Sequence, residues 1–364
     1  MNTMSKVVPK KLQSFYTNLN VDRCFLIEDS TIKNILNKNL NDDTSFIYYN
    51  FYACYHLENN VKSGYLGFNK VNYNENNNFD INILKDFNKS KVLNYGILDI
   101  KFNEINSSIY SSNSDGSISQ FDIKEFYIEK DYIPNNNLIS DNNCSNTLEF
   151  TLDKNNLIVG FNEGNLNIID LSSNKKLFSN EKKVHEYGIW ALCCINNNIF
   201  LSGADDNTIC LNDIRDKKLI VSKNTAHSGG INHVNNFFEN ENIYLSGSYD
   251  ECISLFDIRK INSSLYKQKL NCAVWDVKQI KTKSNRHIIN VASIYEGFNV
   301  FDVTYSINNN KLFNDISFNT LNRYNFHNSI VYGVDSRLHD NKVIVNSCSL
   351  YDNFIAYWSY DLDN

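Results

Sequence analysis

Apolar and polar residues alternate in short runs along most of this chain. Ile209 and Leu211 are separated by one residue, and Ile253 and Leu255 repeat the pattern further on. Alternation with a period of two is typical of β-strands that bury one face, whereas an amphipathic helix repeats every three to four residues. Turn-forming Gly, Asn, Asp and Ser residues separate the runs. The pattern therefore predicts an all-β protein made of many short strands.

The strands are organised in repeats, of which two, 185–216 and 227–260, align along their whole length. Both begin with His, show Gly-Ile before the first alternating run, continue with Leu-Ser-Gly and a turn Asp, and end with Asp-Ile-Arg. Weaker copies cover 95–123, 148–170, 273–303 and 327–358. The Asp that closes a unit falls at 122, 170, 213, 257 and 302, in steps of 48, 43, 44 and 45 residues. Units of this length with four short strands each are typical of β-propeller blades.

The segment 45–71 adds two alternating runs around a polar turn, like one more blade. We therefore expect a seven-bladed β-propeller that forms a single closed domain at 21–364, preceded by an N-terminal extension at 1–20. We expect a strand at Cys24–Ile27 to pair with the last unit, because joining the two ends of the chain removes exposed sheet edges.

Composition and charge narrow the class of protein further. The 364 residues would suggest two or three domains, but a closed repeat fold keeps a long chain in one domain. A net charge of −6 and a pI of ≈ 5.7 argue against a nucleic-acid binder with a general basic surface. No run of apolar residues is long enough to span a membrane, and the first twenty residues lack the apolar core of a signal peptide. We expect a cytoplasmic monomer that binds neither nucleic acid nor membrane.

Asparagine and cysteine usage add little chemistry. Asparagine runs such as 74–78 and 134–137 are interpreted as a compositional bias of surface loops, with a prion-like interaction tract as the alternative. The nine cysteines include no C-x-x-C pair, and the close pair Cys193 and Cys194 is adjacent within an apolar run. This spacing fits disulfide scaffolds and zinc sites badly and favours reduced, buried thiols. We expect neither a metal nor a cofactor.

The closing motifs resemble the WD-repeat family, whose units end in Trp-Asp or a similar dipeptide. The corresponding pairs here are Phe121-Asp122, Phe256-Asp257, Phe301-Asp302 and Tyr357-Trp358. The resemblance implies buried hydrogen-bonded networks, namely His185–Ser202–Asp206, His227–Ser246–Asp250, and His327 with Asp352 and Trp358. A His bonded to a buried Asp also resembles half of a hydrolase triad, but its repetition in several blades favours a structural role.

Other positions lie outside these networks. By the same resemblance, the residue before the turn Asp projects from one rim of the propeller, and the start of each first strand lies near the central channel. The rim positions are Asp205, Tyr249 and Tyr351, with Tyr295 in the blade where Glu296 replaces the Asp. The channel positions are Leu98, Trp190, Asn232, Trp275 and Asp335. These aromatic and acidic groups predict a binding surface, and aromatic packing between blades is the alternative.

A more specific set of motifs runs in order through 185–358: HEYGIW, SGADD, HSGGI, GSYDE, AVWD, EGF, HNSIVYGVD and CSLYD. The set resembles the WD-repeat diphthine methyl-ester hydrolases of diphthamide biosynthesis. The chain departs from the family pattern in three of its motifs. Asp276 stands where the family has Arg, Tyr295 and Glu296 replace a His-Asn pair, and Ser336 replaces a Trp. The first two departures change the charge or the protonation chemistry at those positions.

The resemblance implies an enzyme that removes a methyl ester from over-methylated diphthine, so that the carboxylate can be amidated to diphthamide. The modified histidine of elongation factor 2 would be the substrate, and this factor the partner. Ester hydrolysis needs a base, a nucleophile or activated water, and oxyanion donors. The chain contains no G-x-S-x-G elbow, so we expect a general-base route on the rim. The roles implied are His327 as base, Asp335 as its orienting group, Tyr332 or Tyr249 as oxyanion donor, and Ser349 as candidate nucleophile.

The substrate's trimethylammonium group needs its own site. Asp205 and Glu251 are expected to hold this cation, helped by Trp190 through a cation–π contact. Trp275, Tyr295 and Tyr351, together with Tyr249, complete the expected substrate-binding surface. A non-catalytic WD-repeat scaffold is the alternative function, because a fold alone does not determine an activity.

Overall fold

The structure is a computed structural model of the chain. It describes residues 10–36, 46–73, 91–126, 136–137, 143–179, 183–216, 220–238, 240–282, 286–307, 313–339 and 341–362. The asparagine run at 74–78 and the start of the run at 134–137 lie outside these residues, as do residues 1–9 of the expected N-terminal extension.

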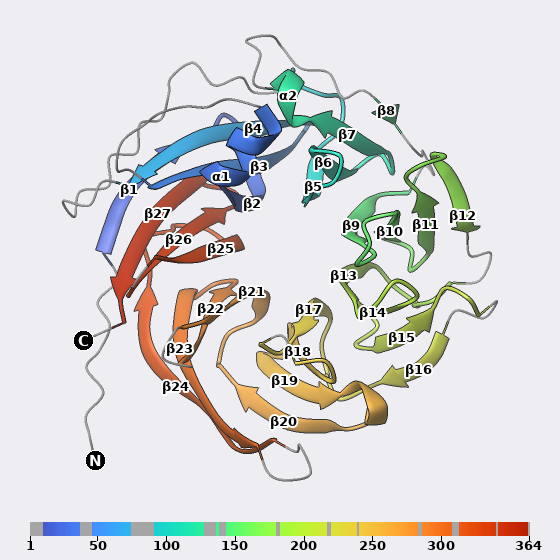
Figure 1. The fold of residues 1–364 in the computed structure, drawn as a ribbon, viewed down its shortest axis with the longest axis vertical. Coiled ribbons are helices and arrows are strands. Elements are labelled where there is room, and N and C mark those ends of the chain that lie inside the picture. The colour runs from blue at the N-terminus through green and yellow to red at the C-terminus, as the bar shows by residue number, and fades with distance from the viewer. Residues whose placement is uncertain are drawn as a thin grey trace.

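Seven antiparallel sheets surround a central axis, each running from an inner strand at the channel to an outer strand at the periphery (Figure 1). Blade 1 contains β2 (Asn20–Glu28), β3 (Phe46–Glu58) and β4 (Val61–Tyr73). Blade 2 contains β5 (Ile97–Asn103), β6 (Ser108–Asn113), β7 (Ile118–Asp122) and β8 (Asn136–Asn137). Blade 3 contains β9 (Ser145–Phe150), β10 (Asn156–Phe161), β11 (Leu166–Asp170) and β12 (Lys175–Ser179). Blade 4 contains β13 (Ile189–Cys194), β14 (Ile199–Ala204), β15 (Ile209–Asp213) and β16 (Ile220–Asn224). Blade 5 contains β17 (Ile231–Asn236), β18 (Ile243–Ser248), β19 (Cys252–Asp257) and β20 (Ser264–Lys269). Blade 6 contains β21 (Val274–Lys281), β22 (His287–Ser293), β23 (Gly297–Ile307) and β24 (Phe313–Tyr324). Blade 7 contains β25 (Val331–His339), β26 (Lys342–Ser349), β27 (Phe354–Asp361) and β1 (Lys10–Tyr16). The predicted all-β, seven-bladed propeller is confirmed.

Helices are short and lie at strand ends in the described part of the chain. They are α1 (Asp29–Leu36), α2 (Ile123–Phe126) and the 3-10 turn η1 (Ile258–Lys260). Asp257 caps η1 by accepting a hydrogen bond from the Arg259 backbone N–H at 2.9 Å, as expected for an Asp at a helix start. Each of these elements connects two strands of the same blade, and none of their residues lines the two cavities described below.

The propeller is closed by β1, which pairs antiparallel with β27 on the outside of blade 7. The prediction that Cys24–Ile27 closes the propeller was wrong, because these residues lie in β2, the inner strand of blade 1, and pair with β3. A closing strand must reach the periphery before the chain enters the channel to start blade 1, so it precedes the first inner strand in sequence. The expected extension at 1–20 therefore supplies a strand of the seventh sheet.

Apolar residues between neighbouring blades form the core. Between blades 6 and 7, Tyr324 stacks on Trp358 with ring centroids 4.3 Å apart and an interplanar angle of 9°, and Phe298 packs against both. All three side chains are fully buried. Burying one aromatic side chain of this size contributes about 1.5–3 kcal/mol, so the stacked blades hold the inner strands, and the channel that they line, in fixed positions.

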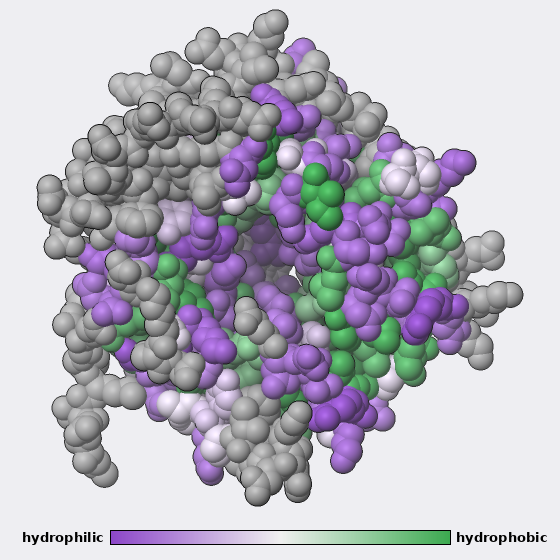
Figure 2. Space-filling view, viewed as in Figure 1, coloured by the Kyte–Doolittle hydropathy of each residue, from purple (hydrophilic) through white to green (hydrophobic). Residues whose placement is uncertain are grey.

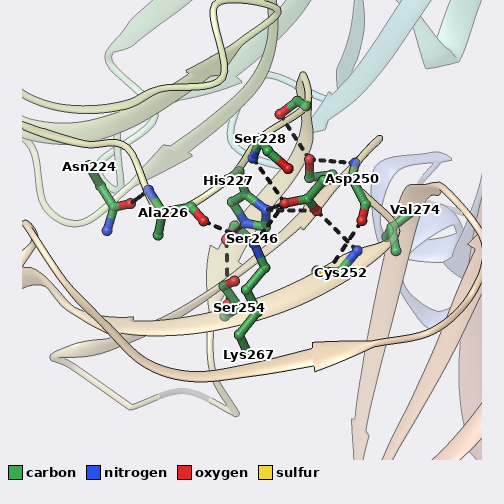
Figure 3. Close-up of polar contacts among 12 residues, drawn as sticks. Asn224, Ala226, His227, Ser228, Ser246, Asp250, Cys252, Ser254, Lys267 and Val274 are labelled. Carbon is green, nitrogen blue, oxygen red and sulfur yellow. Dashed lines mark hydrogen bonds and ion pairs between the residues drawn. The ribbon is translucent and has the colours of Figure 1, made fainter.

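The polar networks predicted in blades 4 and 5 are confirmed. Figure 3 shows His227 between its two partners: its Nδ1 donates to the Asp250 carboxylate at 3.0 Å, and its Nε2 lies 2.8 Å from Ser246 Oγ. His185 makes the same contacts with Asp206 and Ser202, at 3.0 and 2.8 Å. All of these groups are hydrogen-bonded inside a blade, which makes the networks structural.

Ionised carboxylates are part of these networks. Burial by itself would raise the pKa of Asp206, but the hydrogen bond and charge of His185 outweigh it and hold the pKa well below its ordinary value. The pKa of Asp250 is lowered in the same way against burial, by His227 and by Lys267. The folded blade therefore stabilises the charged form of both aspartates.

Blade 7 has a longer version of the network. His327 Nε2 lies 2.9 Å from Ser347 Oγ, which also accepts from Trp358 Nε1. On its other side, His327 Nδ1 lies 2.5 Å from Ser349 Oγ, and Ser349 donates to Asp352 at 2.6 Å. The predicted set of His327, Asp352 and Trp358 is therefore joined through two serines.

Candidate functional site

Each of the seven inner strands carries a β-bulge at the same point, where one extra residue interrupts the pairing with the second strand. The extra residues are Asp22, Leu98, Asn146, Trp190, Asn232, Trp275 and Tyr332. A bulge bends the strand and redirects the side chain of the extra residue. The seven bulges thus direct seven side chains, of five residue types, into the channel.

Six of these seven residues, all but Asn232, line one cavity of ≈ 390 Å³, which we call the mouth pocket. Arg23, Tyr55, Lys62 and Tyr351 are also among its lining residues. Figure 2 shows the hollow at the centre of the molecule, bordered mainly by hydrophilic residues on the face in view. The volume lies within the range of about 300–1,000 Å³ typical of small-ligand sites.

An aromatic wall forms one side of the mouth pocket. The Trp275 ring stacks on Tyr332 at a centroid distance of 4.2 Å and lies 5.7 Å from Trp190 at an angle of 57°. Tyr249 meets Trp275 edge-on at 6.1 Å. Burial raises the pKa of the Tyr249 hydroxyl to about 12, so this group stays a neutral donor. The wall therefore offers aromatic faces and hydroxyl groups.

A carboxylate holds one edge of this wall in place. Trp190 Nε1 donates to Asp205 Oδ2 at 2.8 Å, which orients the indole. Partial burial raises the pKa of Asp205, although the Trp190 hydrogen bond opposes the shift. A Cβ on Gly230 would lie 2.6 Å from Asp205 Oδ1, so only glycine leaves room for the carboxylate in this position.

A polar wall includes the bulge residues Asp22 and Asn146, both of which are buried. Within the described part of the chain, Asp22 Oδ2 and both amide atoms of Asn146 have no hydrogen-bond partner. Burial raises the pKa of Asp22 well above its ordinary value, and the neighbouring Arg23 opposes this shift only in part. Unpartnered buried polar groups in a cavity are rare and mark positions where a ligand can supply the partner.

A second cavity of ≈ 320 Å³, which we call the lower cavity, shares Arg23 and Trp190 with the mouth pocket. Its charged groups form ion pairs between inner strands of different blades. Arg23 lies 3.4 Å from Asp99 and 3.2 Å from Asp276, and His233 Nδ1 lies 3.0 Å from Asp276. Despite the burial of its carboxyl group, Arg23 and His233 keep the pKa of Asp276 below its ordinary range. The pairs hold the inner strands together and fix the orientation of Arg23.

The structure corrects the predicted channel column at one position. Leu98, Trp190, Asn232 and Trp275 are equivalent bulge residues as predicted, but the blade 7 member is Tyr332 and not Asp335. Asp335 lies in the lower cavity, where it contacts Lys278 and Arg337, each at 2.9 Å. These two cations outweigh burial and lower the pKa of Asp335.

The predicted rim residues do project from the mouth. Tyr295 and Tyr351 expose 78% and 68% of their surface, Tyr249 exposes 44%, and the unpredicted Tyr187 exposes 60%. Tyr351 also lines the mouth pocket. Glu251, predicted to hold a cation, lies 3.5 Å from Lys269 and does not line the pocket.

The four predicted catalytic residues occupy three separate places. His327 and Ser349 lie in the buried network of blade 7, Asp335 lies among the ion pairs of the lower cavity, and Tyr332 lies in the aromatic wall. Asp335 bonds Lys278, Arg337 and the Leu26 backbone N–H, so it is not the orienting group expected for His327. The catalytic role of His327 stays a prediction.

The departures from the family pattern have structural partners. Asp276 neutralises Arg23 and orients His233, and Ser336 is buried, with its Oγ accepting from Asn290 Nδ2 at 3.1 Å. Glu296 forms an ion pair with Arg323. These contacts show that the substituted residues fit the fold of this chain.

Sequence reasoning missed Asp22, Arg23 and Asn146. A usable signal was present, because the residue before the bulge is Val or Ile in six of the seven inner strands, as with Val21 before Asp22 and Val331 before Tyr332. A closing strand predicted at Cys24–Ile27 excludes an inner strand there, so the predicted column has no member in blade 1.

Comparison with known families identifies the repeats. A family model described as "WD domain, G-beta repeat" matches residues 177–213 and 219–257. Each match covers most of the outer strand of one blade and the three inner strands of the next. The chain is therefore a seven-bladed β-propeller that contains WD40 repeats.

A comparison with curated proteins gives no significant match. In the part of the chain that the structure describes, no helix is long and apolar enough to cross a membrane.

Proposed function

We propose that this protein hydrolyses the methyl ester of over-methylated diphthine on elongation factor 2, with the mouth pocket as the substrate site. The observation that carries the proposal is the aromatic wall of Trp190, Trp275 and Tyr332 in a pocket that is also lined by the carboxyl group of Asp22. A trimethylammonium group has no N–H donor, so proteins recognise it through aromatic faces and nearby negative charge.

The surroundings of the pocket suit a protein-bound substrate. The exposed tyrosines at 187, 249, 295 and 351 stand around the mouth, where they can contact the surface of a large folded partner. Tyrosine is favoured in such contacts because it combines apolar area with a hydroxyl group. The modified side chain would then enter the pocket while the rim contacts the body of elongation factor 2.

The test uses elongation factor 2 that carries methylated diphthine. Incubation with the wild-type protein should release methanol and lower the mass of the factor by one CH₂ unit. Trp275→Ala should raise KM about 3- to 30-fold, the equivalent of the roughly 0.5–2 kcal/mol expected of a cation–π contact. Tyr16→Ala is the matched control, since this exposed aromatic residue lies on the outer strand β1 and should leave KM unchanged.

A non-catalytic scaffold is the second candidate, favoured by the same exposed tyrosines. It predicts that elongation factor 2 binds with or without the methyl ester and that no methanol appears. Binding without any mass change at saturating protein would therefore replace the hydrolase proposal with the scaffold.

A further inference from the structure

The polar wall of the mouth pocket contains the carboxyl group of Asp22, whose position suits a role beyond attracting a cation. Asp22 is the bulge residue of β2 in blade 1, and the bulge turns its side chain toward the same cavity as the aromatic wall. The residue is buried, and its Oδ2 has no hydrogen-bond partner among the described residues. A buried, unpartnered carboxyl group in a cleft is a typical feature of functional sites.

The environment of Asp22 suits proton transfer. Burial raises the pKa of its carboxyl group well above the ordinary aspartate value, while Arg23 acts in the opposite direction. An ordinary aspartate is too weak a base to take a proton from water near neutral pH, and a raised pKa makes it a better one. Enzymes obtain such bases by burying a carboxyl group, as the fold does here.

The hydrogen-bond donors that line the same pocket include Asn146 and Arg23. Asn146 presents an amide whose nitrogen and oxygen lack partners among the described residues, and Gly188 lies against this amide, since a Cβ there would be 3.2 Å from Asn146 Nδ2. Arg23 follows Asp22 on β2, and its guanidinium is held between Asp99 and Asp276. Fixed donors of this kind stabilise the negative charge that develops on an ester oxygen during hydrolysis.

We propose that Asp22 is the general base of the ester hydrolysis, in place of His327, an inference that rests on the proposed function. The Asp22 carboxylate takes a proton from a water molecule, and the water oxygen bonds to the ester carbonyl carbon. The carbonyl electrons move onto oxygen, and the oxyanion accepts hydrogen bonds from Asn146 Nδ2 and Arg23. When the bond from carbon to the methoxy oxygen breaks, that oxygen takes the proton from Asp22 and leaves as methanol. The product acid then releases a proton to solvent, so water is the only co-reactant.

The substrate itself favours the active form of this base. The trimethylammonium group and the ester are attached to the same carbon of methylated diphthine, so a cation bound at the aromatic wall brings positive charge into the pocket of Asp22. An opposite charge nearby favours the ionised carboxylate. A neutral methyl ester of the same size should therefore react more slowly than the cationic one even at saturation.

The first experiment compares variants on elongation factor 2 that carries methylated diphthine. Asp22→Asn preserves size and should lower kcat by about 100-fold or more, the usual contribution of a general base, while binding of the factor is retained. Asp170→Asn is the matched control, because this carboxylate lies at the end of β11 and, among the described residues, accepts hydrogen bonds from its own turn. An Asp22→Asn protein that is folded and retains kcat within a few-fold of wild type overturns the assignment, whereas a wild type without turnover overturns the proposed function itself.

The second experiment needs no variant and so does not depend on how well Asp22→Asn folds. In a single turnover of wild-type protein in H₂¹⁸O, a general base leaves the label in the carboxylate of diphthine. Label found instead in the peptide that contains Asp22 would mean that its carboxylate attacked the ester directly. That result would overturn the role of general base.

Discussion

Removal of the Asp250 carboxylate gives the sharpest test of how the blades are held together. The carboxylate is buried and accepts four hydrogen bonds, from His227 Nδ1 at 3.0 Å, the Ser228 and Cys252 backbone N–H groups at 3.0 and 3.1 Å, and Lys267 Nζ at 2.8 Å (Figure 3). In Asp250→Ala, the buried His227 loses its acceptor, and the turn between β18 and β19 loses the group that ties its backbone.

The loss of unfolding free energy in Asp250→Ala depends on which of the four donors water can reach. His227 is buried, so its unpaired Nδ1–H costs about 1.5–3 kcal/mol. The lost backbone bonds of the turn add about 1 kcal/mol, and the half-exposed Lys267 adds less than about 1 kcal/mol because water replaces the carboxylate. We therefore expect the free energy of unfolding to fall by about 3 kcal/mol.

Urea unfolding, followed by tryptophan fluorescence, measures this change. Asp170→Ala is the control, since its carboxylate accepts from the exposed Ser172 and Ser173 of its own turn, and it should lose less than about 1 kcal/mol. Equal losses in the two variants would refute the reasoning, because they would show that the buried network adds nothing beyond a surface turn.

Three further predictions concern acid, the aromatic wall and blade 7. The pKa of Asp206 in the folded protein lies below its unfolded value of about 3.9, so its contribution to stability is complete above that pH and is lost as the pH falls through the folded pKa. The difference in unfolding free energy between wild type and Asp206→Asn should therefore narrow below about pH 4. A difference that stays constant down to about pH 2 would contradict this. Gly230→Ala places a Cβ 2.6 Å from Asp205 Oδ1 and should displace this carboxylate, which accepts the hydrogen bond of Trp190 Nε1. We expect KM to rise about 5-fold, or about 1 kcal/mol, with kcat unchanged. An unaltered KM would show that the carboxylate does not position the indole. His327→Gln disturbs the buried hydrogen bonds to Ser347 and Ser349 and should lower the unfolding free energy by about 1–3 kcal/mol. The folded variant should still release methanol at the wild-type rate. A selective loss of turnover in folded protein would restore His327 as the base.

The fold was readable from the chain because its signals are local. Alternation within each run predicts strands, and the recurring Asp sets the length of a blade. The His-Ser-Asp spacing places the network residues in one blade, where pairing of its first three strands brings them together. His227, Ser246 and Asp250 could therefore be grouped without coordinates. The closing strand could not, since β1 is a short segment whose role depends on its distance from the last blade in space.

The site depended on tertiary structure in a different way. Trp190 and Trp275 could be predicted as members of a repeated column. Asp22 and Asn146 belong to no sequence motif, and they are recognised as site residues only because the fold places them in one pocket with residues across the channel. The repeat predicts that each inner strand directs a side chain into the channel, because every blade has the same bulge. Closure of the seven blades decides which side chains meet there and which remain unpartnered, since burial, pKa and hydrogen bonding depend on neighbours that are distant in sequence.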